Sequence, residues 1–185
     1  ILNTLNSLKT PEKEYIAKYY CPQDDENPDI DNERMFYTRK NGLIIDAIRE
    51  KIDSLYADNR NTFDIKAKNT LIALLLYEAA TRANTSGVFK GFHCGFGGSG
   101  KDALSRILKQ VKLEKPFLRN SLKKNKVFKS DAGVLVEKLK KIKFDIVYLD
   151  PPYNQHQYGS NYHLLNTIAL NDKPSVNKIF TLTER

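Results

Sequence analysis

The stretch FDIVYLDPPY, residues 144–153, decides how this chain is expected to fold. Its first six residues are mostly β-branched or aromatic, and they are long enough for one buried strand. The strand must then stop, because Pro151 and Pro152 remove two backbone donors and fix two φ angles. Asp150 is therefore expected at the carboxyl end of the strand, with Tyr153 just beyond the turn. In an open α/β sheet, ligands bind at that end of the strands.

The residues DPPY suit a nucleobase that has been turned out of its duplex. Such a base presents an exocyclic amine, which is a hydrogen-bond donor, and a flat π face. An ionised Asp150 can accept one amine hydrogen, the carbonyl of Pro151 can accept the other, and Tyr153 can stack on the ring. Two acceptors pull the amine toward tetrahedral geometry and free its lone pair for a methyl electrophile. The alternative is a purely structural turn with a packed tyrosine.

Asp-Pro-Pro-Tyr after an apolar strand resembles the catalytic motif of adenine-specific DNA methyltransferases that use S-adenosylmethionine. The continuation NQHQYGSNYHLLNTIAL, residues 154–170, resembles the segment after that motif in the bacterial family whose target-recognition part precedes it. Related enzymes that act on cytosine or on protein glutamine carry Ser or Asn at the first position, so Asp150 favours adenine. The segments ERMFYT (33–38), IDAIREKID (45–53) and ANTSGVFKGFH (83–93) are similar to the helical, DNA-recognising portion of the family.

The resemblance implies a transferase that moves a methyl group from S-adenosylmethionine to the exocyclic amine of a flipped adenine in double-stranded DNA. It also implies a restriction-modification system, with a cognate restriction endonuclease encoded nearby. Two alternatives stay open: an amino-methyltransferase acting on cytosine or RNA, and a non-catalytic, basic DNA-binding module such as a truncated or degenerate methyltransferase. In the family, the cofactor pocket begins near the N-terminus with an aromatic-x-Gly-x-Gly loop, which is expected to lie ahead of Ile1, so we expect that the fragment alone can be inactive.

Length and composition set further bounds. A chain of 185 residues with 41% hydrophobic content can form one domain, or one domain and part of another. It has neither a run of about 18 apolar residues nor a signal-peptide pattern, so we expect a soluble, cytoplasmic protein without a membrane partner. Cys21 and Cys94 form no CxxC pair and predict neither a metal site nor a disulfide. Because the chain begins at Ile1 and its one methionine is Met35, we interpret it as a fragment or a processed chain.

The formal net charge of +8 and the pI of about 9.3 indicate a polyanionic partner. Residues 101–143 contain fourteen Lys or Arg against four Asp or Glu, so this segment alone carries a net charge of +10. We predict that it contacts DNA phosphates through Lys101, Lys123, Lys124 and Lys126. A solvated, lysine-rich surface is the alternative.

Residues 1–120 are predicted to form a mainly helical DNA-recognition portion. The spacing of apolar residues predicts a helix over 42–56 and a second over 65–83, with Asp64 as the N-cap of the second. The acidic, proline-containing stretch over 22–33 predicts a loop.

The glycine-rich stretch GFHCGFGGSGKD, residues 91–102, matches both GxGxxG and GxxxxGK. Both matches are weak. Asp102 stands where a nucleotide-hydrolysing loop needs Ser or Thr, and no acidic residue follows about 20 residues later at a strand end. Three interpretations remain: a flexible connector, a loop whose amides and Lys101 touch DNA phosphate, or a cofactor loop.

Residues 121–185 are predicted to be part of a methyltransferase catalytic domain, namely a βαβ unit plus the DPPY loop. The expected elements are a strand over 127–129, a helix over 134–142 and a strand over 144–149, which would form a parallel pair. The predicted fold class is thus α/β, a partial Rossmann-like methyltransferase sheet with a helical DNA-recognition subdomain.

Two groups of residues complete the predicted site. In the family, an acidic or polar residue after the first of these strands binds the adenine of the cofactor, which makes Asp131 the candidate beside Asp150. Capping of the following helix is the alternative role of Asp131. Residues 154–161 are predicted to form a loop that closes on the extruded adenine. Its predicted DNA contacts are Gln157, Tyr158 and Asn161.

Overall fold

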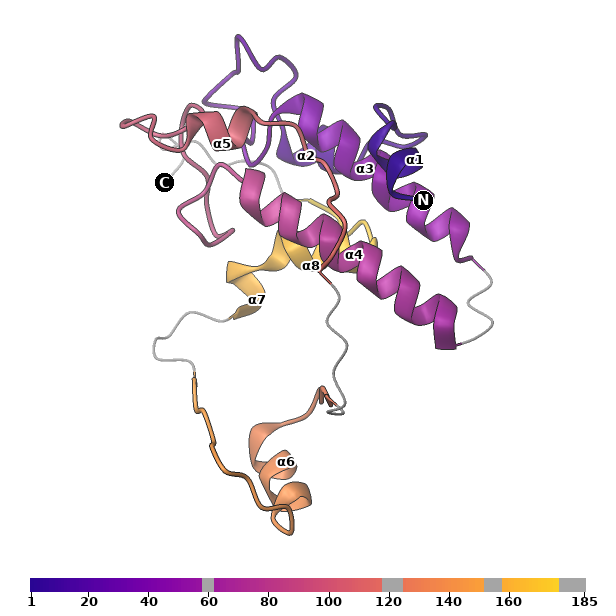
Figure 1. The fold of residues 1–185 in the computed structure, drawn as a ribbon. Coiled ribbons are helices and arrows are strands. Elements are labelled where there is room, and N and C mark those ends of the chain that lie inside the picture. The colour runs from indigo at the N-terminus through magenta and orange to yellow at the C-terminus, as the bar shows by residue number, and fades with distance from the viewer. Residues whose placement is uncertain (58–61, 118–124, 152–157, 177–185) are drawn as a thin grey trace. The chain divides into compact units, whose positions relative to one another are not determined.

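The computed structural model divides into two compact units, and the residues of each unit mainly contact one another (Figure 1). A helical unit comprises residues 1–116 together with 156–185, and a second unit comprises residues 117–155. The functional division into a recognition portion and a catalytic portion stays a prediction. The residues that the structure describes are 1–57, 62–117, 125–151 and 158–176.

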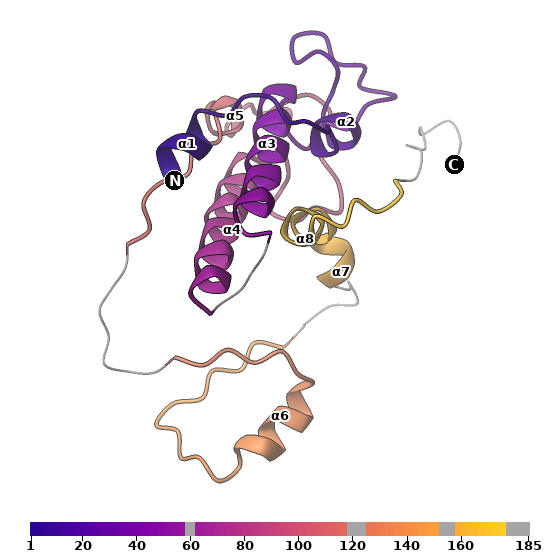
Figure 2. The same cartoon turned by 90° about the vertical axis from the view of Figure 1, so that its right-hand side faces the viewer.

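In the helical unit, two long helices run side by side, α3 and α4 (Figures 1 and 2). The predicted helices over 42–56 and 65–83 are confirmed, although each begins three residues earlier than expected. Asp64 consequently lies in the first turn of α4 and is not its N-cap. The helices of this unit are α1 (Leu2–Asn6), α2 (Ile16–Tyr20), α3 (Arg39–Leu55), α4 (Thr62–Arg82), α5 (Leu104–Leu108), α7 (Tyr158–Asn161) and α8 (His163–Leu170).

The start of α3 is fixed by two side chains that accept its free amides. The hydroxyl of Thr38 accepts from the amide of Asn41 at 3.2 Å. The carboxylate of Asp25 accepts from the amide of Arg39 at 2.5 Å. Both are residues preferred at helix N-caps, and Asp25 comes from the acidic stretch that was predicted to be a loop. This stretch is therefore attached to the helical unit at the N-terminus of α3.

One hydrophobic core joins segments that lie far apart in the sequence. Helix α3 contributes Ile45 and Ile48, and α4 contributes Leu75, all completely buried. Helix α8, which follows the DPPY motif, contributes Leu164 and Ile168 to the same core. Each such side chain stabilises the fold by roughly 1.5–3 kcal/mol on burial. The segment after the motif is thus an integral part of the helical unit.

The second unit contains α6 (Ala132–Leu139) and two extended segments. The described residues form no strand anywhere, so the predicted α/β fold class with a partial Rossmann-like sheet is wrong for this part of the chain. The reason is physical: the patterns over 127–129 and 144–149 favour extended backbone, but a strand exists only when a neighbour pairs with its N–H and C=O groups. No described segment does so. Residues Ile146 and Tyr148 are accordingly 87% and 84% exposed.

Across the described ranges, no helix is long and apolar enough to cross a membrane.

A substitution at Gly42 can test the close contact between α2 and α3. A Cβ at this position would stand 2.4 Å from Sγ of Cys21 and 2.9 Å from Cα of Ala17. Glycine to alanine in an open helix stabilises by about 1 kcal/mol. Gly42→Ala is instead expected to lower the free energy of unfolding by about 1–3 kcal/mol, measured by denaturant titration, because the contact is overpacked.

The matched control is Gly159→Ala in α7, where an added Cβ meets no atom within 4 Å. This substitution is expected to be neutral or slightly stabilising. Wild-type stability of Gly42→Ala would contradict the close approach of the two helices.

Candidate functional site

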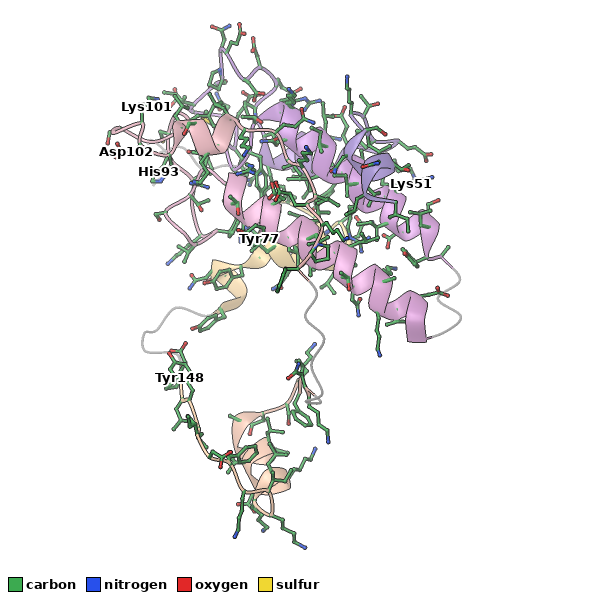
Figure 3. All side chains as sticks on the ribbon, viewed as in Figure 1. Lys51, Tyr77, His93, Lys101, Asp102 and Tyr148 are labelled. Atoms are coloured by element: carbon green, nitrogen blue, oxygen red, sulfur yellow. The ribbon has the colours of Figure 1, made fainter. Side chains whose placement is uncertain are left out.

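The segment with the predicted catalytic residues is extended and exposed. Tyr148, labelled in Figure 3, points away from the ribbon, and both Asp150 and Pro151 are exposed. No described residue pairs with the carboxylate of Asp150. With respect to the described residues, its oxygens and the Pro151 carbonyl are therefore left for a donor on a substrate. Pro152 and Tyr153 lie outside the described residues.

Asp131 caps helix α6. Its Oδ1 accepts from the amide of Val134 at 3.1 Å, so the capping role that the sequence left open is confirmed. Its Oδ2 has no partner in the part of the chain that the structure describes. Capping thus uses one acceptor and leaves the other free, and the role of Asp131 in cofactor binding stays a prediction.

The predicted DNA contacts after the motif fall partly on α7. Gln157 lies outside the described residues. Tyr158 is half exposed, and its ring stacks on that of Tyr162 with centroids 5.9 Å apart. The carbonyl of Asn161 accepts from the amide of Phe89 at 2.6 Å. The expected loop over 154–161 is therefore helical at its end, because contacts with distant residues support a turn that the local sequence pattern does not indicate.

Lys101 closes its own loop. Its backbone is in the left-handed region, with φ at 57°, and its Nζ donates to the carbonyl of Phe96 at 3.0 Å. Lys101 and Asp102 lie close together on this loop, on which His93 also lies (Figure 3). An ammonium group has three donors, so this bond leaves capacity for a phosphate. The other predicted phosphate contacts divide in two: Lys126 is exposed, and Lys123 and Lys124 lie outside the described residues.

The glycine-rich loop is held by Asn84, which the sequence analysis missed. Asn84 is completely buried. Its Nδ2 donates to the carbonyls of Met35 and His93, both at 2.9 Å, and its Oδ1 accepts from the amide of Gly97 at 3.1 Å. Both amide hydrogens of the side chain are thus used. The signal that could have found it is an asparagine directly after a helix and before a glycine-rich stretch.

These bonds bear on two of the three interpretations of the loop, and its contact with DNA phosphate stays a prediction. It is a built structure and not a plain connector. A dinucleotide loop needs a strand before it and a helix packed after it. Among the described residues, no strand precedes this loop, and the helix that follows it, α5, has only five residues. The amide of Gly97 is also occupied by Asn84.

Arg106 belongs to the basic segment, residues 101–143, but its side chain stabilises the helical unit. Its guanidinium donates to the carbonyl of Thr81 and, at 3.2 Å, to that of Ala83. These carbonyls lie at the C-terminal end of α4, where a cation is favoured. One of the fourteen cations of residues 101–143 is therefore committed to a helix end.

In the described part of the chain, no group of three His, Cys, Asp or Glu side chains is placed to hold a metal ion.

A DPPY segment joined to a helical unit is typical of enzymes that methylate amino groups of nucleobases. The chain belongs to the D12 class N6 adenine-specific DNA methyltransferase family, whose model matches residues 2–184. The resemblance inferred from the motif is thereby confirmed.

Three relatives illustrate the match. The chain is similar to type II methyltransferase M.NlaIII of Neisseria lactamica, with 36% identity over 93% of the chain and 46% of the relative. It is 33% identical to type II methyltransferase M.FokI of Planomicrobium okeanokoites over 95% of the chain and 25% of the relative. For type II methyltransferase M.CviAII of Paramecium bursaria Chlorella virus 1, the identity is 32% over 91% of the chain and 45% of the relative. The chain thus spans less than half the length of these relatives. No solved structure matches it significantly.

Asn84 provides a test of the loop. Asn84→Ala removes the partners of two buried carbonyls and one amide, and each buried group left unpaired costs about 1–3 kcal/mol. We expect a loss of about 2–4 kcal/mol in the free energy of unfolding and faster hydrogen exchange at Gly97. Asn69→Ala, which changes an exposed asparagine on helix α4, should change neither quantity. Slow exchange at Gly97 in Asn84→Ala would show that the loop is held by other contacts.

Proposed function

We propose that the full-length protein transfers a methyl group from S-adenosylmethionine to the N6 amine of adenine in double-stranded DNA. It acts as the modification enzyme of a restriction-modification system, whose cognate restriction endonuclease is encoded nearby. Family membership supports this function. The observation that carries it is the adjacent placement of the exposed carboxylate of Asp150 and the carbonyl of Pro151, neither of them paired with a described residue, at the end of one extended segment.

The reaction requires an adenine that has left the base stack. Asp150 accepts one hydrogen of its exocyclic amine, and the carbonyl of Pro151 accepts the other. These two bonds orient the amine and localise the lone pair on nitrogen. The ring of Tyr153 stacks on the base and keeps the amine at the two acceptors, while Pro152 stiffens the turn between them.

S-adenosylmethionine supplies, when bound, a methyl group on a sulfonium that the nitrogen lone pair can attack. The residues present fit such a ligand: Asp131 has an oxygen that capping leaves free, and this oxygen can accept from the amine of the cofactor's adenine. Asp150 adds a second carboxylate to this site. Both carboxylates are exposed.

DNA is held by the basic segment and by the residues after the motif. Lys101, Lys123, Lys124 and Lys126 neutralise phosphates, which supplies affinity without sequence preference. Residues 1–120 form the recognition portion. The residues that contact DNA near the extruded base are Gln157, Tyr158 and Asn161.

Asp150→Ala is expected to abolish methyl transfer in the full-length protein while DNA binding persists, because the carboxylate acts on the amine and not on phosphate. Loss of a preorganised catalytic group costs about a hundredfold or more in rate. Transfer of labelled methyl to duplex DNA measures the rate, and a gel-shift titration measures binding. The matched control is Asp145→Ala, another exposed carboxylate of the same extended segment, which should retain the wild-type rate.

Two outcomes would contradict the proposal. Turnover of Asp150→Ala within tenfold of wild type would remove Asp150 from the chemistry. A wild-type full-length protein that binds DNA but transfers no methyl would favour the alternative function, a non-catalytic DNA-binding module. The cytosine and RNA alternatives are set aside because the family is specific for adenine in DNA.

The salt dependence of DNA binding tests the phosphate contacts. If Lys123, Lys124 and Lys126 each neutralise a phosphate, replacing all three by Gln should reduce the slope of log affinity against log salt by about 0.9 per contact. The control triple of Gln substitutions at Lys9, Lys13 and Lys66 removes the same charge from exposed sites of the helical unit. A slope unchanged from wild type in the first triple would identify the basic segment as an ordinary solvated surface.

A further inference from the structure

Arg49 of α3 forms hydrogen bonds with the C-terminal end of helix α8. The Arg49 side chain is buried, with 5% of the residue exposed. Its Nε donates to the carbonyl of Ile168 at 2.8 Å, and its Nη2 donates to the carbonyl of Ala169 at 3.1 Å. These carbonyls belong to the last turn of α8, and no further turn follows whose amides could donate to them. The planar guanidinium satisfies both at once.

Asp53, one turn further along α3, holds the guanidinium in place. Its Oδ1 lies 2.6 Å from Nη1 of Arg49 and 3.0 Å from Nζ of Lys68 on α4. Its Oδ2 accepts at 2.9 Å from Asn171, which ends α8 in the left-handed conformation. Burial alone would raise the pKa of Asp53, but hydrogen bonds from Arg49, Asn171 and Lys68 lower it to about 2. The carboxylate therefore stays charged at neutral pH, and the cluster ties three helices together.

The cluster of Arg49, Asp53, Lys68 and Asn171 fixes the orientation of α8, which apolar burial alone does not fix. Leu164 and Ile168 attach α8 to the core, but apolar burial is non-directional. Two charge-assisted bonds to neighbouring carbonyls fix how the helix is rotated and how far it slides along α3.

The position of α8 matters for the motif because the connection is short. Seven residue steps lead from Pro151 to Tyr158, the first residue of α7. A fully extended chain of this length reaches about 25 Å at most. Fixing α7 and α8 thus limits the positions open to Asp150 and Pro151.

We propose that Arg49 is a positioning residue for methyl transfer: by holding α8, it sets where the loop after the DPPY motif is anchored on the DNA-recognition portion. This inference rests on the proposed function. Arg49 contacts neither substrate nor cofactor and acts through the carbonyls of Ile168 and Ala169. Its effect is expected on turnover, since the phosphate contacts that dominate DNA affinity do not involve Arg49.

The test compares Arg49→Lys with wild type in the full-length protein. Lysine keeps the charge but cannot bond both carbonyls in one plane. We expect kcat for methyl transfer to fall about tenfold or more, with KM for duplex DNA and the DNA dissociation constant within about twofold of wild type. Hydrogen exchange at the amides of α8 should become faster, a readout that does not depend on catalysis.

Arg39→Lys is the matched control. Arg39 also joins a carbonyl and a carboxylate, with its Nη1 3.1 Å from the carbonyl of Ala17 and its Nη2 2.5 Å from Glu14. These bonds lie at α2 and α3 and do not involve α8. The thermal stability of the Arg39→Lys variant should fall by about as much as that of Arg49→Lys. Its kcat and the hydrogen exchange of the α8 amides should stay at the wild-type values.

Three outcomes would overturn the positioning role: wild-type kcat in Arg49→Lys, an equal loss of kcat in the two arginine variants, or a loss of DNA affinity as large as the loss of kcat. The failure of the proposed function looks different. In that case wild type itself transfers no methyl, and the positioning role fails with it. Methyl transfer by wild type with an unaffected Arg49→Lys variant removes the positioning role alone.

Discussion

The unpaired backbone groups at helix ends are the constraint on which the helical unit depends. A helix leaves amides free at its start and carbonyls free at its end, and burial makes each of them costly unless a partner is found. Asp46 supplies partners for the start of α2, where it accepts from the amides of Tyr15, Ile16 and Ala17 at 2.9–3.0 Å. Arginines do the same for the ends of α4 and α8. Asp46, Arg49 and Arg106 thus serve helix ends, although composition alone suggests a surface charge for binding.

A feature could be predicted from the sequence where the residues that determine it are neighbours in the chain. The two long helices were predictable because their apolar residues recur at helical spacing, which is a local property. Their first residues were missed. Helix α3 begins after its N-cap Thr38, and Asp25, 14 residues before Arg39, accepts from the amide of Arg39. Asp150 could be singled out because proline restricts its neighbours in every context. The sheet could not be predicted for this chain, because strand pairing depends on a partner segment and not on the strand's own residues.

The difference between local and long-range signals also explains why the sequence analysis missed Asn84 and why it gave weight to the glycine-rich loop. Asn84 draws no attention by itself, since its importance comes from three backbone groups in other segments. The glycine-rich loop drew attention through two motif matches, but the amide of Gly97 is bonded to Asn84. In the basic segment, charge could be counted from the sequence, whereas the commitment of Arg106 to the end of α4 required coordinates.

The path of the chain has a consequence for how the protein comes apart. The second unit is an excursion that leaves the helical unit after Pro116 and returns at residue 156, and α8 then fills part of the core that residues 1–116 began. A protease that cuts within the excursion therefore produces two pieces that share one hydrophobic core. Such a nicked chain stays associated without a covalent link, so cleavage there separates the motif from one of its two attachments long before it releases either half of the helical unit.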